Sequence, residues 1–219
     1  MGPEQIQILF QSADHFGINL TDHQLGSFQT YLEELEFWNR KFNLTGLEDR
    51  SRMVIELFLD SLLPSPHLPS EGDLIDVGSG AGFPGLTLKI HCPLRNTFLL
   101  EPNSKKVSFL RHVIRLIGLS GVQTIKSRVE HLPEETRYDV VTARALARFD
   151  KTLEWCAPRV SPGGILVLYL GARAEEDLKN SERSVADHHL RVAKKLSYAL
   201  PGKGSERHTV IFQKERRIV

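Results

Sequence analysis

The sequence predicts an α/β fold with a mostly parallel seven-stranded sheet, an antiparallel edge strand and a helical cap in front. From residue 73 onward, short apolar runs typical of strands alternate with segments of helical period. The first 63 residues contain helical patterns only, and the last two strand-like runs have no helix between them. We therefore expect five parallel strands joined by right-handed crossovers, closed by an antiparallel hairpin at one edge.

The cap is predicted to contain three helices. Residues 4–16 have apolar side chains at helical spacing, and Gly17 is a typical helix stop. Thr21 and Gln24 fit a capping box that opens a helix running to about Lys41. Its expected buried stripe is Leu25, Phe28, Leu32, Leu35 and Phe42. A third helix over 52–63 follows the loop "NLTG". The Pro, Ser and Gly residues of 64–72 predict a linker between the cap (1–63) and a main domain (73–219).

The main domain alternates strands and helices. The expected strands are 74–77, 96–100, 122–125, 138–142, 164–170, 190–198 and 207–214. The expected helices are 84–91, beginning with Pro84 at its first position, 104–117, a short one near 129–133, 150–159 and 174–187. The segment "PGKG" joins the last two strands.

Composition indicates a cytoplasmic protein without a membrane partner. The two cysteines, Cys92 and Cys156, make no disulfide framework, which suits a reducing compartment. The N-terminal residues carry an acid and no basic stretch, unlike a signal peptide, and no apolar run approaches the ~20 residues of a membrane span. The nine histidines show no metal-ligand spacing, so we expect no metal.

The small net charge of +1 hides an asymmetry along the chain. Residues 1–76 hold 4 Lys and Arg against 13 Asp and Glu, a net of −9. Residues 101–151 hold 10 against 6 and residues 191–219 hold 8 against 2, which gives +4 and +6. Such stretches are either ordinary solvated faces or parts of one basic face that meets a polyanion.

The stretch "LIDVGSGAGFPG" (74–85) is the strongest local signal. Glycines let a chain turn tightly after a strand and let a ligand approach the backbone. Gly80, Gly82 and Gly85 fit the dinucleotide fingerprint G-x-G-x-x-G, which would suit a nicotinamide-dependent oxidoreductase. In the other register, Asp76 precedes Gly78, Gly80 and Gly82, the pattern of class I S-adenosylmethionine-dependent methyltransferases with a Rossmann-like fold. The acid there suits the ammonium group of the cofactor.

Features downstream favour the methyltransferase. Glu101 ends the second strand, where a carboxylate suits ribose hydroxyls in either reading. Val129 and Glu130 follow the third strand, where methyltransferases hold the adenine edge, and "SPGG" (161–164) is typical of the turn before their fifth strand. An oxidoreductase and a non-catalytic RNA-binding protein remain as alternatives.

The methyl acceptor is predicted to be an atom that needs no deprotonation. The segment after strand four, "YDVVTARAL", lacks the Asp/Asn-Pro-Pro-Tyr element of many amino-group methyltransferases. Cys92 and Cys156 are interpreted as small buried residues rather than nucleophiles. Guanine N7, with an in-plane lone pair and no proton, fits this class. Arg128 and Arg144 cannot act as bases, so we expect them to position substrate or cofactor.

Several motifs together resemble one family over nearly the whole chain. They are "NLT" (43–45), "LDS" (59–61), "DVGSGAGFPG" (76–85), "KKVSFL" (105–110), "SRVE" (127–130), "ARA" (143–145) and "ERH" (206–208). The set resembles the RsmG, or GidB, family of bacterial methyltransferases that modify a guanine at N7 in small-subunit (16S) ribosomal RNA. The resemblance implies S-adenosylmethionine as cofactor and the ribosomal RNA or subunit as partner, and we expect a monomer.

The resemblance also implies site residues. Those for the cofactor are Gly78, Phe83, Glu101, Val129, Glu130 and Arg144, and those for RNA phosphates are Lys105, Lys106, Arg128 and Arg207. The chain departs from the family's usual pattern in three places. Glu56 and Leu57 stand where Arg-His is common, Leu170 stands where many members have lysine, and Pro102 stands where serine is common after the acid of strand two.

Overall fold

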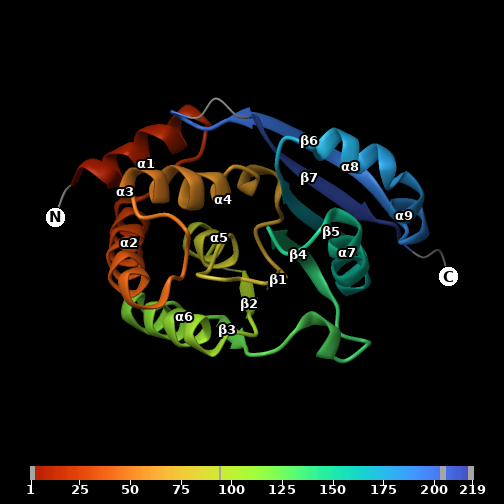
Figure 1. The fold of residues 1–219 in the computed structure, drawn as a ribbon, viewed down its shortest axis with the longest axis horizontal. Helices are drawn as coiled ribbons and strands as arrows, with labels where there is room; N and C mark the ends of the chain where they lie inside the picture. Colours follow the sequence, from red (N-terminus) through yellow and green to blue (C-terminus); the bar gives the residue numbers. More distant parts are fainter. Residues whose placement is uncertain (1–2, 94, 203–205, 217–219) are drawn as a thin grey trace.

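The computed structural model describes residues 3–93, 95–202 and 206–216. A single seven-stranded sheet runs through it in the order β3-β2-β1-β4-β5-β7-β6 (Figure 1). The strands are β1 (Asp73–Val77), β2 (Asn96–Leu100), β3 (Val122–Ile125), β4 (Tyr138–Arg144), β5 (Val160–Leu170), β6 (Leu190–Ala199) and β7 (Glu206–Lys214). The predicted fold class is confirmed.

Five strands are parallel and two form the closing hairpin. The later of the two, β7, lies between β5 and β6 and is antiparallel to both. The two edge strands are β3 and β6, and β6 is antiparallel to its one neighbour. β5 begins at Val160, earlier than predicted, because the segment "SPGG" joins the strand through a shift in pairing with β4 near Tyr138. The turn "PGKG" lies partly outside the described residues.

Helices cover both faces of the sheet. The main-domain helices are α5 (Gly85–His91), α6 (Ser104–Ile117), α7 (Phe149–Cys156), α8 (Ala174–Asn180) and α9 (Glu182–Asp187), with 3-10 turns at Val129–His131 and Ala157–Arg159. Pro84 occupies the N-cap of α5 rather than its first helical position. The predicted helix over 174–187 is divided at Ser181, whose hydroxyl donates to Asp150 of α7 at 2.6 Å.

The cap consists of α1 (Pro3–His15), α2 (Asp22–Phe42) and a third helix made of α3 (Arg50–Met53), a π-helical stretch (Val54–Leu59) and α4 (Asp60–Leu62). The capping box is confirmed, since the Gln24 amide donates to the Thr21 hydroxyl at 3.3 Å and the Thr21 amide to the Gln24 side chain at 2.9 Å. Of the predicted stripe on α2, Phe28, Leu32 and Leu35 are buried and Leu25 is half-buried. Phe42 is 40% exposed, because it lies at the last residue of the helix.

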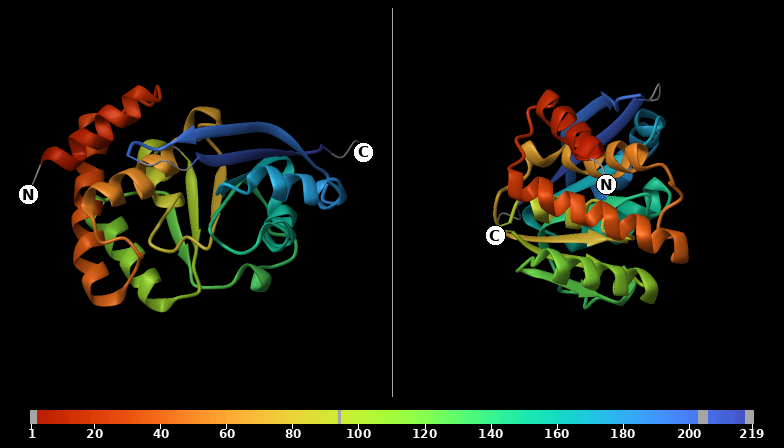
Figure 2. Two further views of the ribbon diagram at one scale, coloured as in Figure 1. Left: turned by 45° about the horizontal axis from the view of Figure 1, so that its top comes forward. Right: turned by 90° about the vertical axis from the view of Figure 1, so that its left-hand side faces the viewer.

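The cap and the main domain share one hydrophobic core. Figure 2 shows α2 beside α6, and the buried cluster there joins cap side chains such as Phe28, Leu35 and Phe58 with Leu86 of α5 and Phe109 of α6. The segment 64–72, predicted as a linker, includes a 3-10 turn at Ser65–His67. The boundary at 64–72 stays a prediction, and the packing across it is continuous.

The opposite face of the sheet has its own core. Ile75, Val77 and Val141 pack there against Leu153 of α7 and Val185 of α9. None of the helices that the structure describes has the length and apolar character needed to cross a membrane.

Candidate functional site

The candidate site lies at the carboxyl ends of β1 and β4, which are neighbours in the sheet. The chain leaves β1 toward β2 on one side and leaves β4 toward β5 on the other. In open α/β sheets, such a reversal of strand order leaves a crevice that binds ligands. The glycine loop, defined as residues 78–84, follows β1 directly into this position.

The backbone of the glycine loop adopts conformations that favour glycine. Gly78, Gly80 and Gly82 have φ of 75°, 58° and 99°. The amides of Gly78 and Ser79 donate to the carbonyl of Leu100 at 2.9 and 3.0 Å, which ties the loop to the end of β2. Because other residues rarely adopt positive φ, the sequence requires glycine at these positions.

The glycines differ in what a side chain would meet. A Cβ at Gly80 would fit without a collision, because its nearest neighbours would be in ordinary contact at 3.9 Å (Gly78 carbonyl) and 4.0 Å (Lys106 Nζ). A Cβ at Gly82 would collide with the Tyr31 hydroxyl of the cap, and one at Gly85 would lie 2.6 Å from Asp76 Cβ. Gly80 therefore faces the open side where a ligand can approach. The cap fills the side of Gly82 where a side chain would lie, and the role of Gly82 in cofactor binding stays a prediction.

Asp76 lies beneath the loop rather than at its surface. The side chain is fully buried, and its carboxylate accepts from the Gly85 amide and the Thr142 hydroxyl, both at 2.9 Å. Burial raises the pKa of Asp76 to about 6, although the hydrogen bonds from Gly85 and Thr142 oppose this shift. The expected contact with a ligand ammonium is not what this geometry offers. Asp76 instead holds the end of β1 to the first turn of α5.

Glu101 is placed as predicted, at the end of β2 beside the glycine loop. Its carboxylate accepts from the Gly80 amide at 2.9 Å and from the Asn103 amide at 2.8 Å. The residue is nearly buried. The carboxylate is therefore fixed against the same loop position whose outer side is open, while its role toward ribose stays a prediction.

Phe83 points into the cap. Its ring stacks on Tyr31 with centroids 5.2 Å apart and meets Phe58 edge-on at 5.0 Å. The Tyr31 hydroxyl donates to the carbonyl of Ala81, within the loop. The Phe83 side chain is thus used for packing, so a ligand would meet the backbone there. Tyr31 is a site-supporting residue that the sequence analysis missed, although it lies three residues after Phe28 on the buried stripe of α2.

Arg144, at the end of β4, is held by the third cap helix. Its guanidinium donates to the carbonyls of Glu56 and Leu57, the latter at 3.4 Å, and lies 3.4 Å from the Asp60 carboxylate. The side chain is only 14% exposed. Both carbonyls belong to the π-helical stretch Val54–Leu59.

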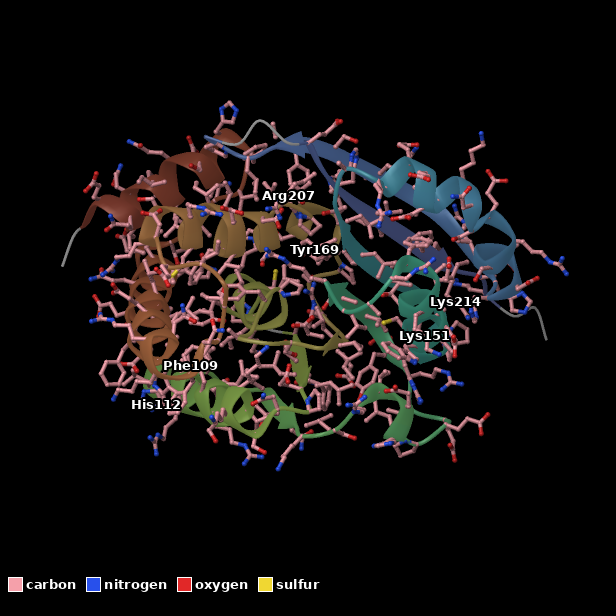
Figure 3. The ribbon with its side chains drawn as sticks, in the orientation of Figure 1. Phe109, His112, Lys151, Tyr169, Arg207 and Lys214 are labelled. Carbon is pink, nitrogen blue, oxygen red and sulfur yellow. The ribbon has the colours of Figure 1, made fainter. Side chains whose placement is uncertain are left out.

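Arg207 is held by the same helix, which corrects its predicted role. Its guanidinium lies 3.1 Å from Glu56 and 3.2 Å from Asp60, and the Tyr198 hydroxyl also donates to Asp60 at 2.8 Å. Figure 3 labels Arg207 beside the cap helix, above Tyr169. Arg207 is therefore paired with carboxylates rather than free for phosphate. Glu56, one of the departures from the family pattern, is one of the two acids in this pairing.

A pocket of about 700 Å³ opens beyond the ends of β4 and β5. Its polar lining includes Asp60, Arg144, Arg148, Asp150, Tyr169, Arg173, Asp177, Asn180, Tyr198 and Arg207. Leu146, which also lines it, lies 2.6 Å from where a Cβ of Gly78 would be. The pocket is thus adjacent to the glycine loop, and its volume is within the range of small-molecule sites, about 300–1,000 Å³.

The other predicted residues lie at the same edge of the sheet. Lys105 is exposed at the start of α6, and Lys106 is half-buried with its ammonium group toward Gly80. Beyond β3, Arg128 and Glu130 are exposed and Val129 is buried. Arg207 belongs to a different part of this edge, because β3 and β7 are five strand positions apart, or about 24 Å at the usual spacing.

The cysteines do not line the pocket. Cys156 is buried on α7, where burial raises the pKa of its thiol, and Cys92 is half-buried just after α5. Across residues 3–93, 95–202 and 206–216, no group of three His, Cys, Asp or Glu side chains is arranged to hold a metal ion. The site consists of a backbone loop, a carboxylate and arginines, which suits a ligand with polar and charged groups.

Comparison with known proteins gives consistent matches. Residues 24–209 match the family model GidB, described as rRNA small subunit methyltransferase G. The Ribosomal RNA small subunit methyltransferase G of Chloroflexus aggregans is 40% identical over 82% of this chain and 77% of its own. The protein of the same name from Syntrophus aciditrophicus is 37% identical over 97% and 91%. Among solved structures, M. jannaschii TYW2 in complex with AdoMet shares the fold, with a TM-score of 0.56 at 14% identity over 72% of this chain and 76% of that one.

Proposed function

This chain belongs to the rRNA small subunit methyltransferase G family, and from that premise we propose that it methylates guanine N7 in small-subunit (16S) ribosomal RNA with S-adenosylmethionine. The observation that carries the proposal is the open face of Gly80 beside the Glu101 carboxylate. There a ligand can touch the loop backbone next to a group suited to ribose hydroxyls.

The residues present fit this cofactor. Gly80 leaves room where a Cβ would be, the loop leads into α5, and Glu101 is nearly buried at its side. When bound, S-adenosylmethionine supplies a methyl group on a positively charged sulfur. We assign Gly78 and Gly80 to the backbone contact, Glu101 to the ribose, and the segment Val129–Glu130 to the adenine edge. Asp76 and Phe83 support the loop from beneath and from the cap.

Guanine N7 needs no general base. Its lone pair lies in the plane of the ring and carries no proton, so the chain has only to align the base and exclude water. The pocket beyond β4 and β5 is the proposed place for the guanine, because it adjoins Gly78 through Leu146. Asp60, the most buried acid of that lining, already accepts from Tyr198 and pairs with two arginines, which fits a role other than proton removal.

The two arginines proposed for positioning act from different places. Arg144 ends β4 between the glycine loop and the pocket, and its contacts with the cap helix fix its guanidinium there. Arg128 is exposed beyond β3, where a phosphate is the suitable partner. Neither can take up a proton, since arginine stays charged.

Transfer of tritium from labelled S-adenosylmethionine to ribosomal RNA and to isolated small subunits tests the proposal, followed by mapping of the methylated base. We expect label on guanine N7, and none with a Gly80→Val variant. Calorimetry with S-adenosylmethionine and NAD tests the alternatives. NAD binding alone would indicate an oxidoreductase, and RNA binding without transfer would indicate a non-catalytic protein.

A further inference from the structure

Two phenylalanine rings near the end of α2 are partly exposed, and each has a lysine ammonium group over its ring. Phe37 is 51% exposed with Lys41 Nζ 4.2 Å from its ring centroid, and Phe42 is 40% exposed with Lys105 Nζ 5.5 Å away. We call these four residues the α2–α6 rim. Lysine over an aromatic face is a cation–π arrangement, and here it occurs twice near the end of α2.

The rim is built on ordered structure. Trp38 packs against Phe42, with centroids 5.4 Å apart, and against His112 of α6 at 5.5 Å, while His112 meets Glu34 at 2.8 Å. Figure 3 labels His112 and Phe109 where α6 packs on α2. These contacts join α2 to the third turn of α6, so little conformational entropy is lost when the rings meet a ligand.

The "NLT" motif fixes the chain just after the rim. The Asn39 side chain donates to the Leu47 carbonyl at 2.9 Å and accepts from the Thr45 amide at 2.8 Å. Asn43 ends α2 in the left-handed region, with φ of 47°. The direction in which the chain leaves Phe42 is thus set by this loop, a motif that the proposed cofactor and acceptor sites do not use.

The rim continues to the proposed cofactor site. Lys105 precedes Lys106, whose ammonium group lies 4.0 Å from where a Cβ of Gly80 would be. α6 also begins directly after β2, whose end carries Glu101. A polymer that reaches the glycine loop therefore has a path along Lys106 and Lys105 to Phe42, and Phe37 lies five residues before it on α2.

We propose that the α2–α6 rim binds a single-stranded part of the substrate RNA by stacking unpaired bases on Phe37 and Phe42, with Lys41 and Lys105 at the phosphates. This rests on the proposed function. Every base has a flat π face, so stacking on aromatic rings is suited to strands of any sequence. A protein partner is the poorer fit, because lysine is depleted at the centres of protein interfaces whereas it accompanies aromatic rings in single-strand grooves.

The test compares two RNA probes of equal length, a mixed-sequence oligoribonucleotide and its abasic counterpart. The double variant Phe37→Leu/Phe42→Leu keeps apolar area and removes the π faces. We expect its affinity to fall about tenfold or more for the base-bearing probe and to stay unchanged for the abasic one. Phe37→Tyr/Phe42→Tyr should bind like the wild type. Phe10→Leu is the matched control, since Phe10 is also 40% exposed but lies on α1.

A methyl-transfer assay distinguishes failure of the rim proposal from failure of the proposed function on which it rests. A wild-type protein that binds S-adenosylmethionine but methylates no ribosomal RNA would overturn the proposed function. A wild type that methylates normally, with a leucine double variant of equal RNA affinity and equal KM, would overturn the rim alone. The rim is also overturned if the leucine variant loses binding only to assembled subunits and not to naked RNA, because a ribosomal protein would then be its partner.

Discussion

The backbone amide of Gly80 donates a 2.9 Å hydrogen bond to the carboxylate of Glu101. The same carboxylate accepts from the Asn103 amide at the start of α6, so one side chain fixes the glycine loop and the helix after β2. These hydrogen bonds thereby fix the position of the carboxylate proposed for the ribose relative to the open side of Gly80.

Gly80→Val should weaken binding of S-adenosylmethionine. The branched side chain would fill the open space over the loop, and valine is strained at a φ of 58°. We expect affinity to fall at least ~30-fold, about 2 kcal/mol, with a native circular dichroism spectrum. Calorimetric titration measures it, and unchanged affinity in a folded variant would remove the loop from the cofactor site.

Substitution of a second glycine distinguishes the effect of backbone strain from the effect of blocking the cofactor site. Gly118 has a φ of 75°, and a Cβ there would meet nothing within 4 Å. It caps the far end of α6 from Lys105 and Lys106. Gly118→Val should therefore lose similar stability to Gly80→Val while its affinity for S-adenosylmethionine stays that of the wild type.

Asp76 should make stability depend on pH in an unusual direction. Its pKa is about 6 in the folded protein against about 3.9 for an ordinary aspartate. Between these values the folded state keeps a proton that the unfolded state has released, so the free energy of unfolding falls as pH rises, by up to about 3 kcal/mol. Asp76→Asn carries no titrating group and lacks this loss. Urea unfolding at pH 4 to 7 should show the difference between variant and wild type growing with pH. A difference that is constant over this range would contradict the raised pKa.

Local sequence signals predicted the fold well because they are carried by neighbouring residues. The capping box at Thr21 and the strand ending at Val77 depend on spacing within a few residues. The start of β5 was misplaced because its first residues pair with β4 through a register shift, which depends on a partner about 20 residues away. The position of β7 between β5 and β6 likewise depends on tertiary packing and not on local sequence.

The site was predicted less completely, for the same reason. Glu101 and Gly80 lie where strand-end reasoning puts them. The cap fills the free side of Gly82, stacks on Phe83, and supplies Glu56 and Asp60 to Arg207, and none of these contacts follows from a local pattern in the sequence. These contacts join residues 50 or more positions apart, and no local period indicates them.

Arg144→Ala should reduce methyl transfer and stability together. Arg144 donates to the Glu56 carbonyl and lies 3.4 Å from the nearly buried Asp60 carboxylate, so its removal takes a hydrogen bond and an ion pair from the contact between β4 and the cap helix. We expect a loss of about 2–3 kcal/mol in the free energy of unfolding.

Arg148→Ala is the control for Arg144→Ala. Arg148 is exposed and lines the same pocket, so its removal should change stability by less than about 0.5 kcal/mol. Thermal and urea unfolding measure both variants beside tritium transfer. A wild-type melting temperature for Arg144→Ala would mean that the contacts with the cap helix contribute nothing to folding.

RNA affinity should depend on salt through Lys105, Lys106 and Arg128, and not through Arg207. The first three are available to phosphate at the β2 and β3 ends of the sheet. Arg207 lies about 24 Å from β3 and is held by Glu56 and Asp60, acids that also pair with Arg52 and Arg144. Each phosphate contact releases counterions and adds about 0.7–0.9 to the slope of log affinity against log salt, so three contacts predict a slope of about −2 to −3. Lys105→Ala/Lys106→Ala should flatten it by up to about 2, and Arg207→Ala should leave it unchanged. Titrations with ribosomal RNA from low to moderate salt distinguish these outcomes. A slope that changes with Arg207→Ala but not with the double lysine variant would place the RNA over the β7 end of the sheet, where Arg207 would have to exchange its carboxylate partners for phosphate.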